Sequence, residues 1–143
     1  MSPLLALLVL AALVAAATGA GLLWRARAGR VRERHGEQRV SEAELGPQVR
    51  FGRRGTVVLL TTPSCALCPG ARRTIRSELA GREGIASAEV DLSERLDLAR
   101  RLHVFRTPTT LVLDPRGRIA ARAEGGLDPL GLRSRLDALA TTS

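Results

Sequence analysis

The sequence has almost no aromatic residues and no lysine. Of its 143 residues 2% are aromatic, tyrosine is absent, and all 22 basic residues are arginine, giving a net charge of +8. Because 45% of the residues are still hydrophobic, a core must consist of Leu, Val, Ile and Ala. Proteins that bind single-stranded nucleic acid combine basic residues with aromatic platforms, which this sequence lacks. We therefore predict no nucleic-acid partner and interpret the charge as facing a membrane and solvent.

Charged side chains are absent from residues 1–24. About 20 apolar residues suffice for a helix to cross a bilayer, so we predict a membrane-spanning anchor in this segment, over Pro3–Trp24. The small residues at positions 15–21 leave a cleaved secretory signal as the alternative. A signal peptide normally has a basic stretch before its apolar run, and none precedes this one, which favours retention as an anchor.

Arginines follow the apolar segment directly, at positions 25, 27, 30, 32, 34 and 39. Basic residues flank membrane spans on the cytoplasmic side, so the asymmetry predicts that the rest of the chain lies in the cytoplasm. These arginines can also bind anionic lipid headgroups, at about 1 kcal/mol for each residue near the surface. We assign residues 25–45 to an Arg-rich linker, with a helical turn near Ser41, and residues 46–143 to one folded domain.

The two cysteines of the chain, Cys65 and Cys68, lie in one Cys-Ala-Leu-Cys motif. The apolar run before them, residues 56–60, is typical of a buried parallel strand, and residues 70–79 are typical of an amphipathic helix. At such a strand-to-helix junction the helix dipole stabilises a thiolate. We predict that Cys65 attacks a disulfide and that Cys68 resolves the mixed disulfide.

Two other interpretations of the cysteine pair are open, but neither is favoured, and we predict no metal site. A structural zinc site usually has four Cys or His ligands, and the other candidates in the sequence are His35 and His103. Alternatively, the pair packs as two small apolar residues without chemical activity.

The rest of the chain alternates between strand and helix patterns. We expect Ser93 and Asp128 to cap helices, with Leu96, Leu98 and Leu102 facing the core. The predicted elements are a short strand over 48–51, a strand over 85–91, a helix over 94–102, an antiparallel hairpin of the runs 104–114 and 119–123, and a helix over 129–140.

From about residue 46 to 140 this order of elements resembles the thioredoxin family. The specific feature is a Cys-x-x-Cys motif followed, about 40 residues later, by Thr107-Pro108-Thr109 just before a strand. The resemblance implies an α/β, thioredoxin-like fold: a central mixed sheet flanked by helices, here with one N-terminal transmembrane helix. It implies that Pro108 is cis and lies against the cysteines, and that the backbone of Thr107 pairs with an extended substrate segment; the alternative is a trans proline that starts a strand. Pro63 and Ser64 would line the same surface.

The sequence departs from the family's pattern around the cysteines. Ala-Leu separates them in place of Gly-Pro, and Ser64 stands where typical thioredoxins have Trp. Leu59 replaces the buried Asp that assists the resolving thiol, so deprotonation of Cys68 must rely on water or another group, and we expect slow resolution. Pro69 has no N–H, so we expect it to leave the carbonyl of Cys65 unbonded.

These features together predict a membrane-anchored thiol–disulfide oxidoreductase that reduces protein disulfides. Its electrons would come from a reductase or another dithiol protein, with no cofactor in this chain. One alternative reverses the topology, because membrane-anchored thioredoxin-like proteins outside the cytoplasm serve cytochrome maturation or disulfide repair. The other is a non-catalytic adaptor or holdase on the same scaffold, for which the missing buried acid argues.

Overall fold

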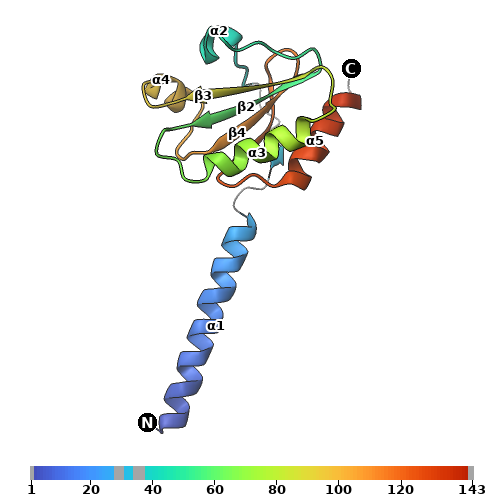
Figure 1. Cartoon of the computed structure of the whole chain (residues 1–143). Coiled ribbons are helices and arrows are strands. Elements are labelled where there is room, and N and C mark those ends of the chain that lie inside the picture. Colours follow the sequence, from blue (N-terminus) through green and yellow to red (C-terminus); the bar gives the residue numbers. More distant parts are fainter. Residues whose placement is uncertain (1, 28–30, 34–37, 142–143) are drawn as a thin grey trace.

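The computed structural model describes residues 2–27, 31–33 and 38–141. Figure 1 shows the arrangement of the helices and strands. In chain order they are α1 (Pro3–Arg27), β1 (Arg32–Glu33), α2 (Glu42–Leu45), β2 (Gly55–Thr61), α3 (Cys68–Leu79), β3 (Ile85–Asp91), α4 (Leu96–Arg101), β4 (Thr109–Leu113), β5 (Ile119–Glu124) and α5 (Pro129–Thr141).

The α1 helix is apolar on all sides. Over Pro3–Trp24 its mean hydropathy is 2.3 and no part of this stretch is buried. A helix of this length and composition can cross a bilayer, although a secretory signal at the N-terminus has the same properties. The predicted apolar helix is therefore present and fits a transmembrane anchor.

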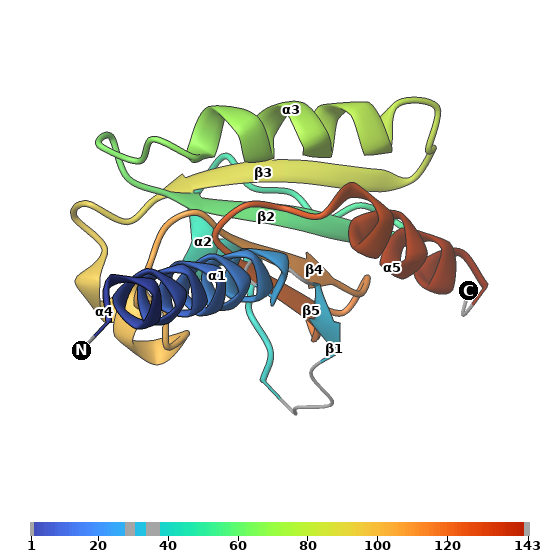
Figure 2. The same ribbon diagram turned by 90° about the horizontal axis from the view of Figure 1, so that it is seen from below.

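Strands β1 to β5 form one mixed sheet in the order β1-β5-β4-β2-β3. Strand β2 pairs parallel with β3, in register from Gly55↔Ile85 to Thr61↔Asp91, and antiparallel with β4. Strands β4 and β5 form the predicted antiparallel hairpin. The parallel pair is connected through α3, which runs alongside β3 and β2 in Figure 2. This is the mixed sheet that the sequence predicts.

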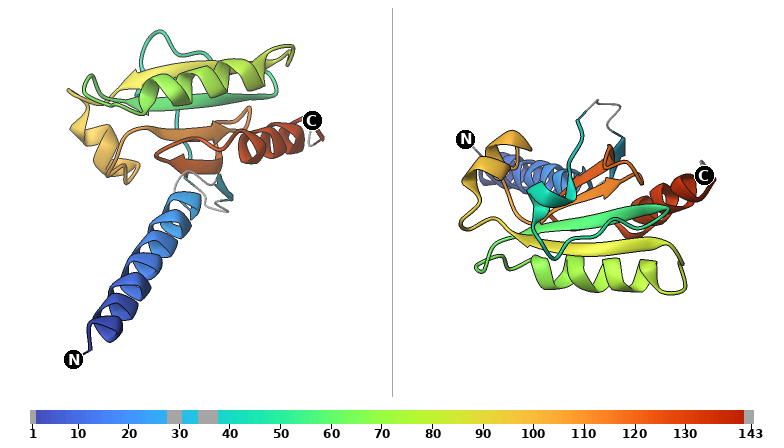
Figure 3. Two further views of the ribbon diagram at one scale, coloured as in Figure 1. Left: turned by 60° about the horizontal axis from the view of Figure 1, so that its bottom comes forward. Right: turned by 90° about the horizontal axis from the view of Figure 1, so that it is seen from above.

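Two apolar layers cover the two faces of the sheet. Val57 and Leu59 face the layer that contains α3 and α5, whereas Val58 and Leu60 face the layer that contains α2 and α4. Figure 3 shows α3 and α4 on opposite sides of the sheet. Every residue of β2 is buried, because a central strand that is covered on both faces has no solvent-facing side. The buried residues of both layers are aliphatic, as the composition predicts.

The segment before β2 differs from the sequence prediction. Residues 48–51 do not form a strand, because their backbone groups bond locally: the Val49 N–H donates to the carbonyl of Gly46 and the Phe51 N–H to the Glu42 carboxylate. Instead β1, in the predicted linker, pairs antiparallel with β5 at the sheet edge.

Residues 38–45, also assigned to the linker, pack into the domain. Val40 and Leu45 are 2% and 1% exposed and belong to the core. The helical turn at Ser41 is confirmed, with a complete capping box between Ser41 and Glu44. The tight approach of this segment requires glycine in the hairpin turn, because a Cβ at Gly117 would lie 2.1 Å from the Val40 carbonyl oxygen. The folded domain thus begins upstream of residue 46.

The cap of α4 was predicted wrongly and that of α5 correctly. The N–H and hydroxyl of Ser93 donate to the Asp91 carboxylate, at 2.8 and 2.5 Å, and these bonds lower the pKa of Asp91. Ser93 therefore caps no helix; α4 starts at Leu96, which is 62% exposed, and buries Leu98. The Asp128 carboxylate accepts the N–H groups of Leu130 and Gly131 at the start of α5, as predicted.

An ion pair joins the carboxyl-terminal end of α3 to α5. Arg133 donates two hydrogen bonds of 2.9 Å to Glu78, whose side chain is 8% exposed. This pairing lowers the pKa of Glu78. A carboxyl group whose pKa is lower in the folded state stabilises the fold above its unfolded pKa of about 4.3, and this contribution disappears as the pH falls through the folded pKa.

We predict that Glu78→Gln lowers the urea midpoint of unfolding at pH 7, and that the difference from the wild type vanishes in acid. Urea titrations at several pH values measure both effects. Glu83→Gln is the control, because Glu83 is exposed and enters no ion pair among the residues placed in the structure. Equal midpoints at pH 7, or a difference that persists in acid, would contradict the prediction.

Candidate active site

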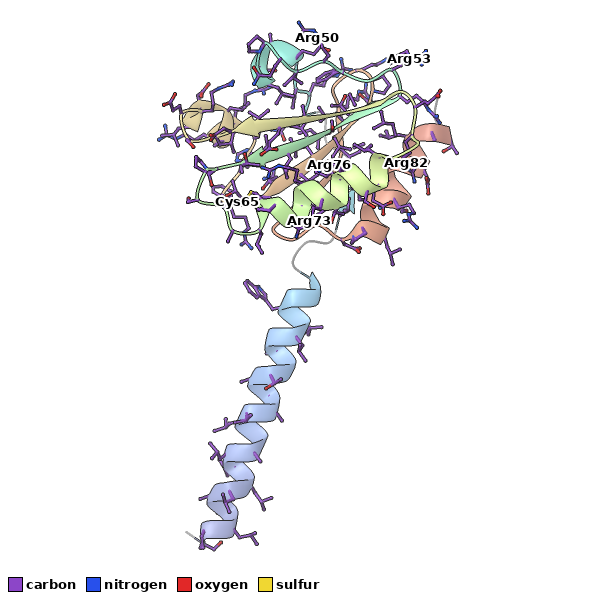
Figure 4. All side chains as sticks on the ribbon, viewed as in Figure 1. Arg50, Arg53, Cys65, Arg73, Arg76 and Arg82 are labelled. Atoms are coloured by element: carbon purple, nitrogen blue, oxygen red, sulfur yellow. A yellow bond between two sulfur atoms is a disulfide. The ribbon has the colours of Figure 1, made fainter. Side chains whose placement is uncertain are left out.

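Cys65 and Cys68 form a disulfide between the end of β2 and the start of α3. The S–S distance is 2.06 Å and the Cα atoms are 5.5 Å apart. Cys65 lies in the loop and is partly exposed. Figure 4 shows it near the first turn of α3. Cys68 is the first residue of the helix and is 3% exposed. A partner can therefore reach the sulfur of Cys65, whereas that of Cys68 is covered.

Pro69 fits the start of α3 without a lost hydrogen bond. The first N–H groups of any helix lack a helical partner, so proline in the first turn removes nothing. The carbonyl of Cys65 accepts the N–H of Cys68 at 3.4 Å. The expectation of an unbonded Cys65 carbonyl is therefore wrong. The helix of 12 residues directs the positive end of its dipole at the cysteine pair.

The loop before β4 lies against the loop of the cysteines. The Thr107–Pro108 peptide bond is cis, as the family resemblance implies, and Pro108 is buried. The hydroxyls of Thr62 and Thr107 are 3.0 Å apart and share a hydrogen bond. The sequence analysis did not single out Thr62, whose position follows only from the register: Leu60 pairs with Thr109, and two residues further Thr62 meets Thr107.

Several residues of these two loops are exposed. Pro63 and Ser64, the predicted contact residues, are exposed in the turn before Cys65. Leu67, between the cysteines, is 57% exposed, and Phe105, close before the cis bond, is 86% exposed. The sequence analysis named neither of the last two residues, because a leucine or phenylalanine is expected in the core unless its surroundings are known.

The buried neighbours of the site include no acid where thioredoxins carry one. Leu59 is 2% exposed and packs in the apolar layer beneath α3. In register with it on β3 is Glu89, which accepts hydrogen bonds of 2.8 and 2.5 Å from Arg72, one turn beyond Cys68. Hydrogen bonds from Arg72 and Thr61 lower the pKa of Glu89. Glu89 is therefore ionised at neutral pH and is a weak proton acceptor.

Nothing in the described part of the chain assembles a metal site. No group of three or more Cys, His, Asp or Glu residues is placed to hold an ion there. His103 is exposed beside the Phe105 ring, at a centroid distance of 6.5 Å, and His35 lies outside the described residues. Both cysteines are already engaged in the disulfide.

Comparison with known proteins gives a clear answer at the level of fold. No family model and no curated protein matches the sequence. Solved structures similar to this chain include thioredoxin-2, a component of the malaria parasite's protein secretion machinery, at 19% identity with a TM-score of 0.55, covering 73% of this chain and 99% of that one.

Two further structures have the same arrangement. A thioredoxin-like protein from Clostridium perfringens is 22% identical with a TM-score of 0.54, covering 62% of this chain and 72% of that one. Mitochondrial thioredoxin 3 from Saccharomyces cerevisiae, in its oxidised form, is 16% identical with a TM-score of 0.52, covering 60% and 79%. The chain therefore has the thioredoxin-like fold, with its Cys-x-x-Cys pair at the junction of β2 and α3.

Proposed function

We propose that this protein is a membrane-anchored thiol–disulfide oxidoreductase that reduces protein disulfides through Cys65 and Cys68. The observation that carries the proposal is the pair of sulfurs of unequal exposure at the amino end of α3, beside the cis Thr107–Pro108 bond. A purely structural disulfide has no need of an accessible sulfur, whereas exchange requires one.

The reaction proceeds in two exchanges. The Cys65 thiolate attacks one sulfur of the partner's disulfide; that S–S bond breaks, and the other partner sulfur leaves as a thiolate that takes up a proton. Cys68 then loses its proton, attacks the sulfur of Cys65 and releases the second partner thiol. The partner gains two electrons and two protons, and the Cys65–Cys68 disulfide is the product. A reductase or another dithiol protein supplies the electrons that reopen it.

The loop before β4 offers a place for the partner's backbone. The main-chain N–H and C=O groups of Thr107 make no hydrogen bond within the described part of the chain. An extended substrate segment can use both, as added strands do at sheet edges. The exposed Pro63, Ser64 and Leu67 of the cysteine loop, and Phe105 before the cis bond, are available for contact with such a segment.

The anchor and the side of the membrane are further parts of the proposal. The apolar length of α1 supports a span, and the arginines that follow it support a cytoplasmic domain. In that reducing compartment the dithiol form dominates, which favours reduction of substrates over their oxidation. Two alternatives compete with this proposal: a domain on the outer side of the membrane, and a non-catalytic adaptor.

We predict that Cys68→Ser in the full-length protein accumulates mixed disulfides with partners, while Cys65→Ser accumulates none. Once Cys65 has attacked, Cys68 is the only other thiol in the chain that can release the partner. Non-reducing gels of membranes blocked with an alkylating reagent measure the adducts, and the double variant is the control. The opposite pattern would exchange the two roles; no adducts from either variant, with insulin disulfides left intact by the wild type, would favour the adaptor.

We also predict that Cys65 is shielded from an impermeant maleimide in intact cells and labelled after permeabilisation. The experiment uses Cys68→Ser after brief reduction, so that Cys65 is the single thiol available. Fractionation of the same cells should find the full-length chain with the membranes. Labelling in intact cells would place the domain outside, and a soluble chain that begins near Gly21 would identify the residues before it as a cleaved signal.

A further inference from the structure

The hydroxyl of Thr110 is buried without a partner. Thr110 is 1% exposed, and its Oγ1 makes no hydrogen bond within the described part of the chain. Other buried threonines of β2 and β4 do bond: the Thr56 hydroxyl accepts the Gly52 N–H at 3.0 Å, and that of Thr109 donates to the Arg106 carbonyl at 2.8 Å. An unpartnered buried hydroxyl lowers stability, so its presence calls for a functional reason.

Thr110 lies in the layer beneath the cysteine helix. On β4 it pairs directly with Leu59 of β2, and Val112, two residues further on the same face, packs in the apolar cluster with Leu59 and Ala71 of α3. Cys68 precedes Ala71 by three residues and so lies on the same side of α3, 3% exposed. Cys68 on α3 and Thr110 on β4 thus border the same buried layer, which lies between the helix and the sheet.

We propose that Thr110 donates a hydrogen bond to the sulfur of Cys68 when the disulfide opens. In the disulfide, this sulfur is a neutral, weak acceptor, and the hydroxyl has little to bond with. A thiolate is charged, and hydrogen bonds to charged acceptors are about twice as strong as neutral ones. The hydroxyl would therefore favour the thiolate over the thiol and compensate in part for the missing carboxylate at Leu59.

This inference deepens the proposed function, on which its role in resolution rests. In the second exchange the Cys68 proton leaves to water, the Cys68 thiolate attacks the sulfur of Cys65, and the partner's thiolate departs and takes up a proton. Thr110 keeps its own proton throughout. It acts only by stabilising the charge on Cys68 before attack, which is the step that a buried leucine at position 59 leaves unassisted.

The charged groups near Cys68 do not supply the same effect. Arg72, one turn along α3, is engaged by Glu89 through two hydrogen bonds, and the pair is close to neutral as a unit. The lowered pKa of Glu89 makes its carboxylate only a weak acceptor for the thiol proton near neutral pH. Thr110, on the strand beneath α3, is buried and its hydroxyl has no hydrogen-bond partner among the described residues.

The test titrates Cys68 directly, in the full-length protein in detergent with Cys65→Ser as the background. Thiolate absorbance in the ultraviolet reports the pKa of Cys68, and the absence of tyrosine removes the usual interfering titration. We expect Thr110→Val, which keeps the shape and removes the hydroxyl, to raise this pKa by about one unit, a roughly tenfold loss of thiolate below it. Thr110→Ser, which keeps a hydroxyl at this position, should leave the Cys68 pKa close to its value in the Cys65→Ser protein.

A matched control and a second readout separate this role from packing. Thr56→Val removes a buried, bonded hydroxyl at the far end of β2 and should destabilise the fold while leaving the Cys68 pKa unchanged. With both cysteines present and oxidised, Thr110→Val should raise the urea midpoint, because it removes an unpartnered group. If Thr110→Val fails to fold, Thr110→Ala replaces it, and we expect the same rise in the Cys68 pKa.

Three results would overturn the inference: an unchanged Cys68 pKa in Thr110→Val, an equal rise in Thr110→Ser, or a lower urea midpoint of oxidised Thr110→Val. The last would mean that the hydroxyl is already bonded in the disulfide form. The titration needs no partner protein, so it remains informative if the wild type proves unable to reduce disulfides. In that case the proposed function fails while the hydrogen bond to Cys68 stands.

Discussion

The burial of β2 on both faces is the constraint on which the rest of the structure depends. Its residues Val57, Val58, Leu59 and Leu60 are each at most 2% exposed. Burial of such a side chain contributes about 1.5–3 kcal/mol, so these four contribute roughly 6–12 kcal/mol. That is comparable with the net stability of a typical domain, about 5–15 kcal/mol. The strand can hold this position only if helices cover both sides of it.

The same constraint builds the site. The cysteine loop follows the carboxyl end of β2, at the centre of the sheet. Helix α3 must return over the strand to cover Val57 and Leu59. The return buries Cys68 in the first turn and leaves Cys65 outside. Because β4 is antiparallel to β2, Thr107 and Pro108, just before β4, lie at the same end of the sheet as the cysteine loop. Unequal exposure of two neighbouring sulfurs is thus a consequence of how the central strand is covered.

The site also shows a balance between stability and chemistry. A leucine at position 59 strengthens the apolar layer beneath α3, whereas a carboxylate there would cost stability and assist proton transfer. The unpartnered Thr110 hydroxyl is the opposite case, a polar group that weakens the layer next to the cysteines. The apolar layer beneath α3 therefore borders one buried hydroxyl that has no partner among the described residues.

Local sequence signals predicted the elements whose causes are local. The apolar run of β2, the Asp128 cap and the hairpin turn at Gly117 each depend on a few adjacent residues. The predicted start of α4 was wrong because Ser93 bonds to Asp91 and caps no helix. The predicted strand over residues 48–51 was wrong because Glu42 accepts the Phe51 N–H.

The same distinction applies to the site. Its sulfurs and the cis proline follow from motifs, since their spacing is visible in the sequence. Thr62 and Thr110 depend on strand register, and the exposure of Leu67 and Phe105 depends on which neighbours cover them. Contacts between distant segments of the chain decide these features.

The most direct test of the account is the redox equilibrium of the Cys65–Cys68 disulfide. The full-length protein is equilibrated with thiol–disulfide buffers of graded potential, and the reduced fraction is counted by mass after alkylation. The account predicts reversible opening in the folded domain at a potential within the range of thiol oxidoreductases, roughly −120 to −270 mV. A disulfide that opens only when the domain unfolds, or only below about −300 mV, would be structural and would contradict the account.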